Sequence, residues 1–216
     1  MTVQCKKLNK GALWLVLGGA FVLRLLLAAI TTGYSYDMGC FGAWAAKMAQ
    51  TGPAAFYSEG YFADYPPGYL YVLGAVGAVQ KIFGLDFDGA AFKMLLALVP
   101  AVCDCAAAWL VAQLGQRCLR DGRGVLCLTA FAALHPAALF DTAVWKQIDG
   151  AFTLPILLCF LLLETKNYLP AAIFYGIALS IKPQALLFGP VLAACFLAGI
   201  VLEQDRLRAF GRCFAG

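Results

Sequence analysis

Charged residues are scarce in this sequence: Asp, Glu, Lys and Arg together make up 13% of the chain, whereas hydrophobic residues make up 62%. A soluble domain keeps roughly a quarter of its residues charged, so this scarcity argues against a fully water-exposed surface. The mean hydropathy of +0.80 agrees with that conclusion. The apolar residues also form runs of roughly 17 to 22, the length that crosses the hydrocarbon core of a bilayer. The composition therefore predicts an all-α integral membrane protein.

Other features are missing as well. No small-x-small cleavage site accompanies the first apolar run, so residues 11–30 are predicted to form a signal anchor rather than a cleaved signal peptide. Most of the nine cysteines lie within or near the ends of apolar runs, where cysteine behaves as a small hydrophobe, and they imply no disulfide framework. The net charge of +4 is scattered among loops and forms no basic stripe, so no nucleic-acid partner is expected.

The apolar runs predict a polytopic bundle of about six spans. The predicted spans are residues 11–30, 93–115, 125–140, 150–164, 169–181 and 183–202. A seventh run, residues 68–83, is expected to lie in the outer interface. Counting it as a span would place Arg117, Arg120 and Arg123 on the outer side, against the tendency of short cytoplasmic loops to collect Lys and Arg. Its two glycine interruptions and its opening tyrosines also suit an interface.

This topology places both termini in the cytoplasm and predicts a long first outer loop, residues 31–92, that contains interfacial helices. The basic residues expected on the cytoplasmic side are Lys6, Lys7, Lys10, Arg117, Arg120, Arg123, Lys166, Arg206, Arg208 and Arg212. Most acidic and polar groups that remain fall in the outer segments and in the short turn after residue 181. No internal repeat is evident. Transporters tend to carry polar groups near the bilayer midplane and to repeat internally, so this asymmetry favours chemistry at one face.

Asp37 is the most conspicuous acid in the first outer loop. It follows the first span by a few residues, in the sequence Tyr34-Ser35-Tyr36-Asp37. A carboxylate at the mouth of a hydrophobic bundle is partly desolvated, which can tune its pKa for work as a general base. The alternative is a structural role, because an Asp before a predicted helix at residues 39–50 would serve as its N-cap. The spacing alone leaves both interpretations open.

Two further polar segments lie on the same predicted side. Residues 64–71 combine an acid, two prolines and three tyrosines, and they predict either an interfacial anchor or a rigid cavity wall with tyrosines that stack on a sugar. Residues 141–149 place a Trp, a Lys, an amide and two acids between two spans. Trp145 could stack on a sugar, and Gln147 and Asp149 could bind hydroxyl groups. Interfacial snorkelling and helix capping are the alternative for this second segment.

Three charged residues in or beside spans need partners. Lys182, in the turn Lys182-Pro183-Gln184, lies at an outer end where Lys is disfavoured, so it is predicted either to neutralise a phosphate or to snorkel. Arg24 could snorkel outward, pair with Asp37 or contact a substrate phosphate. Asp104 lies mid-span and should be paired, but the sequence does not name its partner.

Taken together, these segments resemble a known family. The acid after the first span, the Tyr-Pro-Pro-x-x-x-Tyr element from Tyr65 to Tyr71, the His135-Pro136 pair followed by Trp-x-Gln-x-Asp, and the Lys-Pro-Gln turn occur in the order seen in GT-C glycosyltransferases. The nearest branch resembles the GPI mannosyltransferases and their bacterial homologues, and the resemblance covers roughly residues 12–196. Lys146 stands where that family more often has a glycine.

The resemblance implies a specific activity. Such enzymes transfer a hexose, mannose in the nearest branch, from a polyprenyl- or dolichyl-phosphate carrier to a hydroxyl of a glycan, lipid or protein acceptor outside the cytoplasm. Asp37 would be the general base. The residues expected to contact substrates are Arg24, Tyr36, Asp64, Tyr65, Tyr69, Trp145, Lys146, Gln147, Asp149, Lys182 and Gln184.

The resemblance also sets expectations for the whole chain. Residues 1–216 would form one transmembrane module similar to the N-terminal part of a longer enzyme, in a bacterial cell membrane and among its lipids. No cofactor is named, and a divalent cation is left open, because two nearby acids do not define a metal site by spacing alone. The alternatives to a transferase are a transporter or flippase of lipid-linked substrates and a truncated, non-catalytic membrane scaffold.

Overall fold

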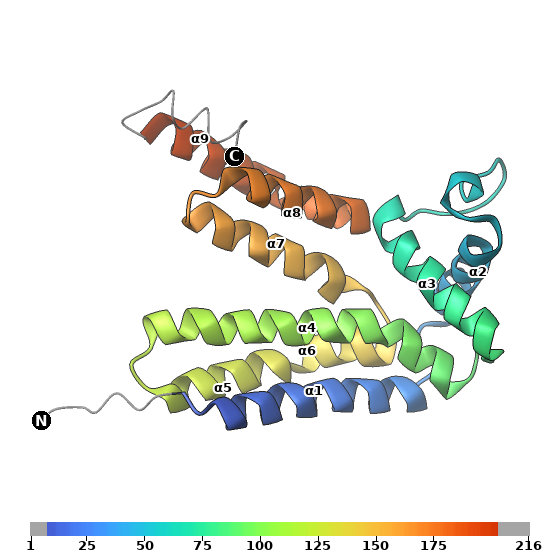
Figure 1. The fold of residues 1–216 in the computed structure, drawn as a ribbon, viewed down its shortest axis with the longest axis horizontal. Helices are drawn as coiled ribbons and strands as arrows, with labels where there is room; N and C mark the ends of the chain where they lie inside the picture. The colour runs from blue at the N-terminus through green and yellow to red at the C-terminus, as the bar shows by residue number, and fades with distance from the viewer. Residues whose placement is uncertain (1–7, 203–216) are drawn as a thin grey trace, which may run out of the picture.

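The computed structural model describes residues 8–202, which are helical apart from turns and short connections and contain no strand (Figure 1). The chain order is α1 (Lys10–Ile30), α2 (Ser35–Thr51), the 3₁₀ turn η1 (Pro53–Ala55), α3 (Pro67–Phe83), α4 (Ala90–Cys118), α5 (Gly122–Ala133), α6 (Pro136–Leu139), the π-helical turn η2 (Phe140–Trp145), α7 (Asp149–Glu164), α8 (Tyr168–Ile181), the 3₁₀ segment η3 (Pro183–Phe188) and α9 (Gly189–Leu202). The predicted all-α class is therefore confirmed for this part of the chain.

The helices form two groups joined through α4. Helices α1, α4 and α5 pack together, and α7 packs on the other side of α4 with α8 and then α9 beside it (Figure 1). Helices α2 and α3 pack on each other and lie across one end of this bundle, where α3 contacts α4 and α8 (Figure 1). The turns that join α4 to α5 and α7 to α8 lie at the opposite end (Figure 1).

This arrangement separates the polar segments by end. Arg117, Arg120, Arg123 and Lys166 belong to the end away from α2 and α3, as the charge pattern predicts. Which end faces the cytoplasm stays a prediction. Lys10 begins α1 at the end away from α2 and α3, and the other predicted residues, Lys6, Lys7, Arg206, Arg208 and Arg212, lie outside the described residues.

Within residues 8–202, three helical segments are long and apolar enough to cross a membrane: Lys10–Ile30, Ala90–Cys118 and the nearly continuous Gly122–Trp145. Helices α7 and α8 have only 16 and 14 residues, fewer than the roughly 20 that a perpendicular span needs. The predicted count of six spans is therefore not confirmed and stays a prediction.

The third segment is interrupted for a local reason. Helix α5 ends at Ala133, and His135 has an extended ψ of 126° before Pro136. Proline disfavours the helical region for the residue before it and has no N–H to donate. The chain restarts at Pro136 and widens into the π-helical turn η2, which ends at Trp145. This break determines how residues 145–149 reach the end of the bundle.

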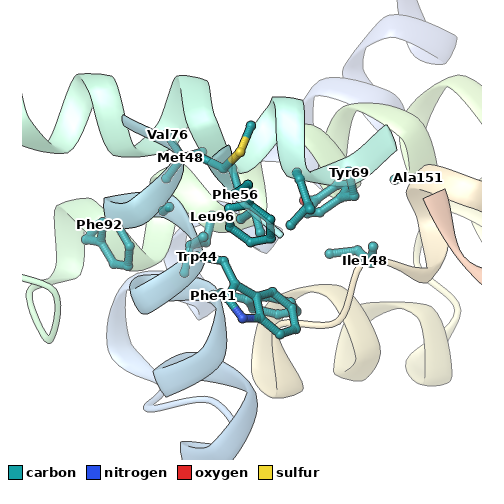
Figure 2. Close-up of a cluster of buried hydrophobic side chains, with 13 residues drawn as sticks. Phe41, Trp44, Met48, Phe56, Tyr69, Val76, Phe92, Leu96, Ile148 and Ala151 are labelled. Atoms are coloured by element: carbon teal, nitrogen blue, oxygen red, sulfur yellow. The ribbon is translucent and has the colours of Figure 1, made fainter. Parts of the chain in front are cut away.

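The segment predicted as the first outer loop is a packed helical pair rather than an open connection. Phe41 and Trp44 from α2 lie against Phe56, Tyr69 from α3, and Ile148 in one buried cluster (Figure 2). The two helices approach closely at Gly77, where a Cβ would collide with the carbonyl of Ala45. Helix α3 also begins within one residue of the predicted apolar run at 68–83. The core therefore anchors α2, and with it Asp37, to the rest of the fold.

Candidate functional site

The centre of the site is the side-chain amide of Gln147. It lies in the connection between η2 and α7, while Asp37 is in the first turn of α2 and Lys182 ends α8. The Nε2 of Gln147 donates a hydrogen bond to Asp37 Oδ2, and its Oε1 accepts one from Lys182 Nζ at 3.3 Å. Residues from three distant parts of the sequence therefore converge, and one amide separates a carboxylate from an ammonium group.

Two more predicted residues complete this polar cluster. Lys182 Nζ forms an ion pair with Asp149, and Lys182 itself is only 8% exposed. The Tyr65 hydroxyl donates to Gln147 Oε1 at 3.5 Å. Burial, together with the charges of Asp37 and Asp149, raises the pKa of Tyr65 well above its usual range. Tyr65 therefore keeps its proton and acts as a hydrogen-bond donor at neutral pH.

The position of Asp37 differs from the capping alternative. The N-cap of α2 is Tyr34, which makes no side-chain capping bond, and Asp37 is the third residue of the helix. Its carboxylate bonds to Gln147, and it lies near the positive end of the helix dipole, where an anion is stabilised. The geometry therefore favours a role in the site over the capping alternative.

Lys146 points away from the surface of the site. It is 3% exposed, and its Nζ donates to Thr31 Oγ1 at 2.6 Å and to the carbonyl of Ala143 at 2.8 Å. Burial, with a smaller effect from the charge of Lys93, lowers the pKa of Lys146 to about 8. The resemblance placed Lys146 against the substrate, but the structure directs its side chain into the protein.

Arg24 is fully buried in the bundle and bonds to Asp104, with 3.0 Å between Nε and Oδ2. Its Nη1 also donates to the carbonyl of Ala133 at 2.7 Å, and Thr142 donates to the same Asp104 oxygen at 2.7 Å. The pairing of Arg24 with Asp37, one of the three interpretations open at the sequence level, is therefore not observed. Asp104 gains the partner that the sequence could not name.

The remaining predicted residues divide between core and surface. Tyr69 is 2% exposed and belongs to the hydrophobic core, so it forms no part of the site's surface. Tyr36 is exposed, and partial desolvation, followed by the charges of Cys40 and Asp64, raises the pKa of its hydroxyl. Gln184 shares a cleft of about 390 Å³ with two predicted residues and three apolar ones, Asp64, Tyr65, Pro183, Leu186 and Leu187.

Trp145 lines a different cleft of about 570 Å³. Its ring lies 5.8 Å from that of Tyr34 and 5.9 Å from that of Phe140. Trp145 therefore does not face the cleft that contains Gln184. The two clefts have no lining residue in common.

Sequence reasoning missed Thr31 and Thr142. The Thr31 hydroxyl accepts a hydrogen bond from Lys146, and the Thr142 hydroxyl donates one to Asp104. No sequence pattern marks a threonine near the end of a span as the partner of a buried charge. Over residues 8–202, no group of three or more His, Cys, Asp or Glu side chains could hold a metal ion. The divalent cation that the sequence left open has no preformed site of that kind in this part of the chain.

Comparison with known proteins gives one match. Residues 62–214, more than half of the chain, match the family model described as glycosyltransferase family 87. The matched range contains Tyr65, Gln147, Asp149 and Lys182, whereas Asp37 precedes it. No curated protein and no solved structure matches the chain.

Proposed function

The chain belongs to glycosyltransferase family 87, and from this we propose that it transfers a hexose from a polyprenyl-phosphate carrier to an acceptor hydroxyl, with Asp37 as the general base. We further propose mannose as the hexose, a GT-C type of fold, and a site on the outer face of a bacterial cell membrane. The observation that carries the proposal is the Gln147 amide, which bonds Asp37 on one side and Lys182 on the other.

Asp37 supplies the base in this mechanism. Gln147 engages Oδ2, and we assign Oδ1 to the acceptor. The acceptor hydroxyl transfers its proton to Asp37 as its oxygen attacks the anomeric carbon of the sugar. The bond from that carbon to the phosphate oxygen breaks, the carrier leaves as polyprenyl phosphate, and the configuration at the anomeric carbon is inverted. General-base catalysis of this kind contributes roughly 10²- to 10⁴-fold to a rate.

Lys182 stabilises the leaving group. An ammonium group has three protons, and Lys182 directs bonds to Asp149 and to Gln147 Oε1. The third proton is available to a phosphate oxygen, and positive charge placed where negative charge develops is a strong source of transition-state stabilisation. Arg24, the other cation considered for the phosphate, is fully buried against Asp104. We therefore assign the carrier phosphate to Lys182 alone.

The cleft beside Lys182 suits a sugar. Asp64 and Gln184 offer an acceptor and an amide for hydroxyl groups, and Tyr65 offers an aromatic edge at the same cleft. Exposed Leu186 and Leu187 continue from it along η3 and give the carrier an apolar path. The acceptor, whether glycan, lipid or protein, would approach Asp37 from the side of Tyr36.

A transporter or flippase of lipid-linked substrates is the less favoured alternative, because the family is one of glycosyltransferases. The charged pair inside the bundle is consistent with this preference. Arg24 and Asp104 bond to each other instead of lining a polar path. A non-catalytic scaffold would bind the carrier without turnover, and kinetics separates it from an enzyme.

The test is the substitution Asp37→Asn in the full chain. The purified protein in lipid nanodiscs receives a short-chain polyprenyl-phosphate sugar, with mannose and glucose compared, and the released polyprenyl phosphate is measured by mass spectrometry. Transfer by Asp37→Asn should fall by about 100-fold or more, because the amide cannot accept the proton. The control is Glu59→Gln, at an exposed acid of the same outer loop.

Glu59→Gln should retain the wild-type rate, and circular dichroism should show equal helix content in all three proteins. Undiminished transfer by Asp37→Asn would show that Asp37 is not the base. Carrier binding without transfer in the wild type would favour the scaffold, and movement of the intact carrier across vesicles would favour the transporter.

A further inference from the structure

Lys146 combines two features that are unfavourable when taken alone. Its backbone has φ 71°, in the left-handed region that a residue with a Cβ occupies only at an energetic cost. Its side chain is 3% exposed, and burying an ammonium group is costly unless the group is well bonded. Both features occur directly before Gln147, the residue that holds Asp37.

The ammonium group of Lys146 joins the ends of two helices. Thr31 is the C-cap of α1, and its hydroxyl accepts from Lys146 Nζ. The second acceptor, the carbonyl of Ala143, belongs to the last turn of η2. The carboxyl ends of helices carry partial negative charge, so a cation is stabilised there. One ammonium group therefore ties α1 to η2.

The aliphatic stem of Lys146 also contacts the segment that leads into α2. A Cβ added to Gly33 would lie 2.9 Å from Lys146 Cγ and 2.8 Å from Met38 Cγ. The chain at residue 33 therefore passes directly over the lysine. The backbone N–H of Tyr34 donates to the carbonyl of Trp145 at 3.2 Å. Lys146 thus touches both segments whose relative position determines the Asp37–Gln147 bond.

We propose that Lys146 is a positioning residue, which holds the turn before Gln147 against the segment before Asp37 so that the two side chains meet. Its effect on sugar transfer rests on the function proposed above, but its effect on the two segments does not. Lys146 contacts no substrate in this scheme and acts through Gln147 and Asp37.

Removing the ammonium group should leave the fold intact. The Thr31 hydroxyl lies 2.9 Å from the Ala143 carbonyl and can donate its one proton there in Lys146→Met, while the Leu27 carbonyl keeps the backbone N–H of Thr31 at 3.0 Å. The left-handed backbone would then lack its anchor. Lys146→Gly also loses the anchor, but glycine adopts a positive φ without steric cost. Comparing the two variants separates the backbone conformation from the ammonium bonds.

The first measurement is steady-state transfer in nanodiscs with a polyprenyl-phosphate sugar. Lys146→Met should lower kcat by roughly 10- to 100-fold, as expected for a misplacement of about 1 Å, with the donor KM nearly unchanged. Lys146→Gly should recover part of that loss. Thr31→Val, which removes the hydroxyl and keeps the shape, should lower kcat in the same way. Lys81→Met, at an exposed lysine in the last turn of α3, is the matched control.

The second measurement needs no activity. The Trp145 ring packs near Tyr34, 5.8 Å between centroids, so its exposure reports whether the two segments stay together. Acrylamide quenching is compared between each protein and its Trp145→Phe counterpart, since the chain has four tryptophans. The quenching attributable to Trp145 should rise in Lys146→Met and Thr31→Val and stay at the wild-type value in Lys81→Met.

The outcomes separate this inference from the proposed function. If no donor supports transfer by the wild type, the proposed function fails, and the quenching series still decides the role of Lys146. A rise in donor KM at constant kcat would make Lys146 a substrate ligand and overturn the inference. Wild-type quenching in both Lys146→Met and Thr31→Val would also overturn it.

Discussion

The buried pair of Arg24 and Asp104 gives a quantitative test of the fold beneath the site. Arg24 is fully buried, and the Asp104 side chain is 12% exposed. In Arg24→Met the carboxylate keeps only its bond from Thr142, and in Asp104→Leu the guanidinium keeps only backbone carbonyls. Removing one partner of a buried ion pair costs about 3–5 kcal/mol, because the other charge stays buried without its partner.

The double variant Arg24→Met/Asp104→Leu should cost much less than the sum of its parts. It leaves no charge inside the bundle, and apolar replacement of a buried pair is often neutral in free energy. Because each single change costs about 3–5 kcal/mol and the double change much less than their sum, the coupling energy of the cycle should be favourable and at least about 3 kcal/mol, at or above the upper end of the range seen for residues in contact.

The assay is reversible unfolding in mixed micelles of increasing sodium dodecyl sulfate content, followed by circular dichroism for the wild type and the three variants. If the two single costs add to within about 0.5 kcal/mol, the residues behave as independent sites and the pairing is refuted. A double variant less stable than both single variants would refute the desolvation argument as well.

Two further predictions concern stability. Gly77→Ala should lower the free energy of unfolding by about 1–3 kcal/mol, because the added Cβ would collide with the Ala45 carbonyl and overpack the contact. The control Gly74→Ala should change the free energy of unfolding little, because its Cβ would lie 3.4 Å from the flexible Met48 side chain. Equal melting temperatures for the two variants would contradict this prediction. Burial lowers the pKa of Lys146 from 10.5 to about 8, so the unfolded chain binds the proton more tightly and the free energy of unfolding should rise between these two pH values. Thermal melting of the wild type and Lys146→Met across this range should show the rise in the wild type only, and parallel curves would contradict the lowered pKa.

Much of the site could be predicted from the sequence because its members mark the ends of apolar runs. Asp37 comes shortly after α1, Gln147 after η2 and Lys182 after α8, all at the same end of the bundle. The distribution of Lys and Arg among the loops is enough to predict that the three residues lie on one side. The helical class follows from composition in the same way. The extent of α3, Pro67–Phe83, could be anticipated because proline and glycine bound the apolar run.

Side-chain directions could not be predicted in this way. The buried face of α1 is the stripe Leu13, Leu17, Ala20, Arg24 and Ala28, and Arg24 occupies a regular position in it. The other faces of α1 are nearly as apolar, so the sequence offers no contrast that marks the inward side. Tyr69 was unpredictable for a similar reason, because a tyrosine suits a core and an interface equally well. The inward turn of Lys146 depends on a positive φ that no composition signals.

The interrupted third helical segment connects these observations. Because Pro136 stops α5 and the chain continues as η2, Thr142 and Ala143 come to face α1 and α4. Two cations then join η2 to its neighbours at different points: Arg24 through Asp104 and Thr142, and Lys146 through Ala143 and Thr31. Gln147 follows directly after this doubly held turn. The position of the Gln147 amide against Asp37 is therefore determined more by α1, which carries Arg24 and is capped by Thr31, than by α7, which begins at Asp149.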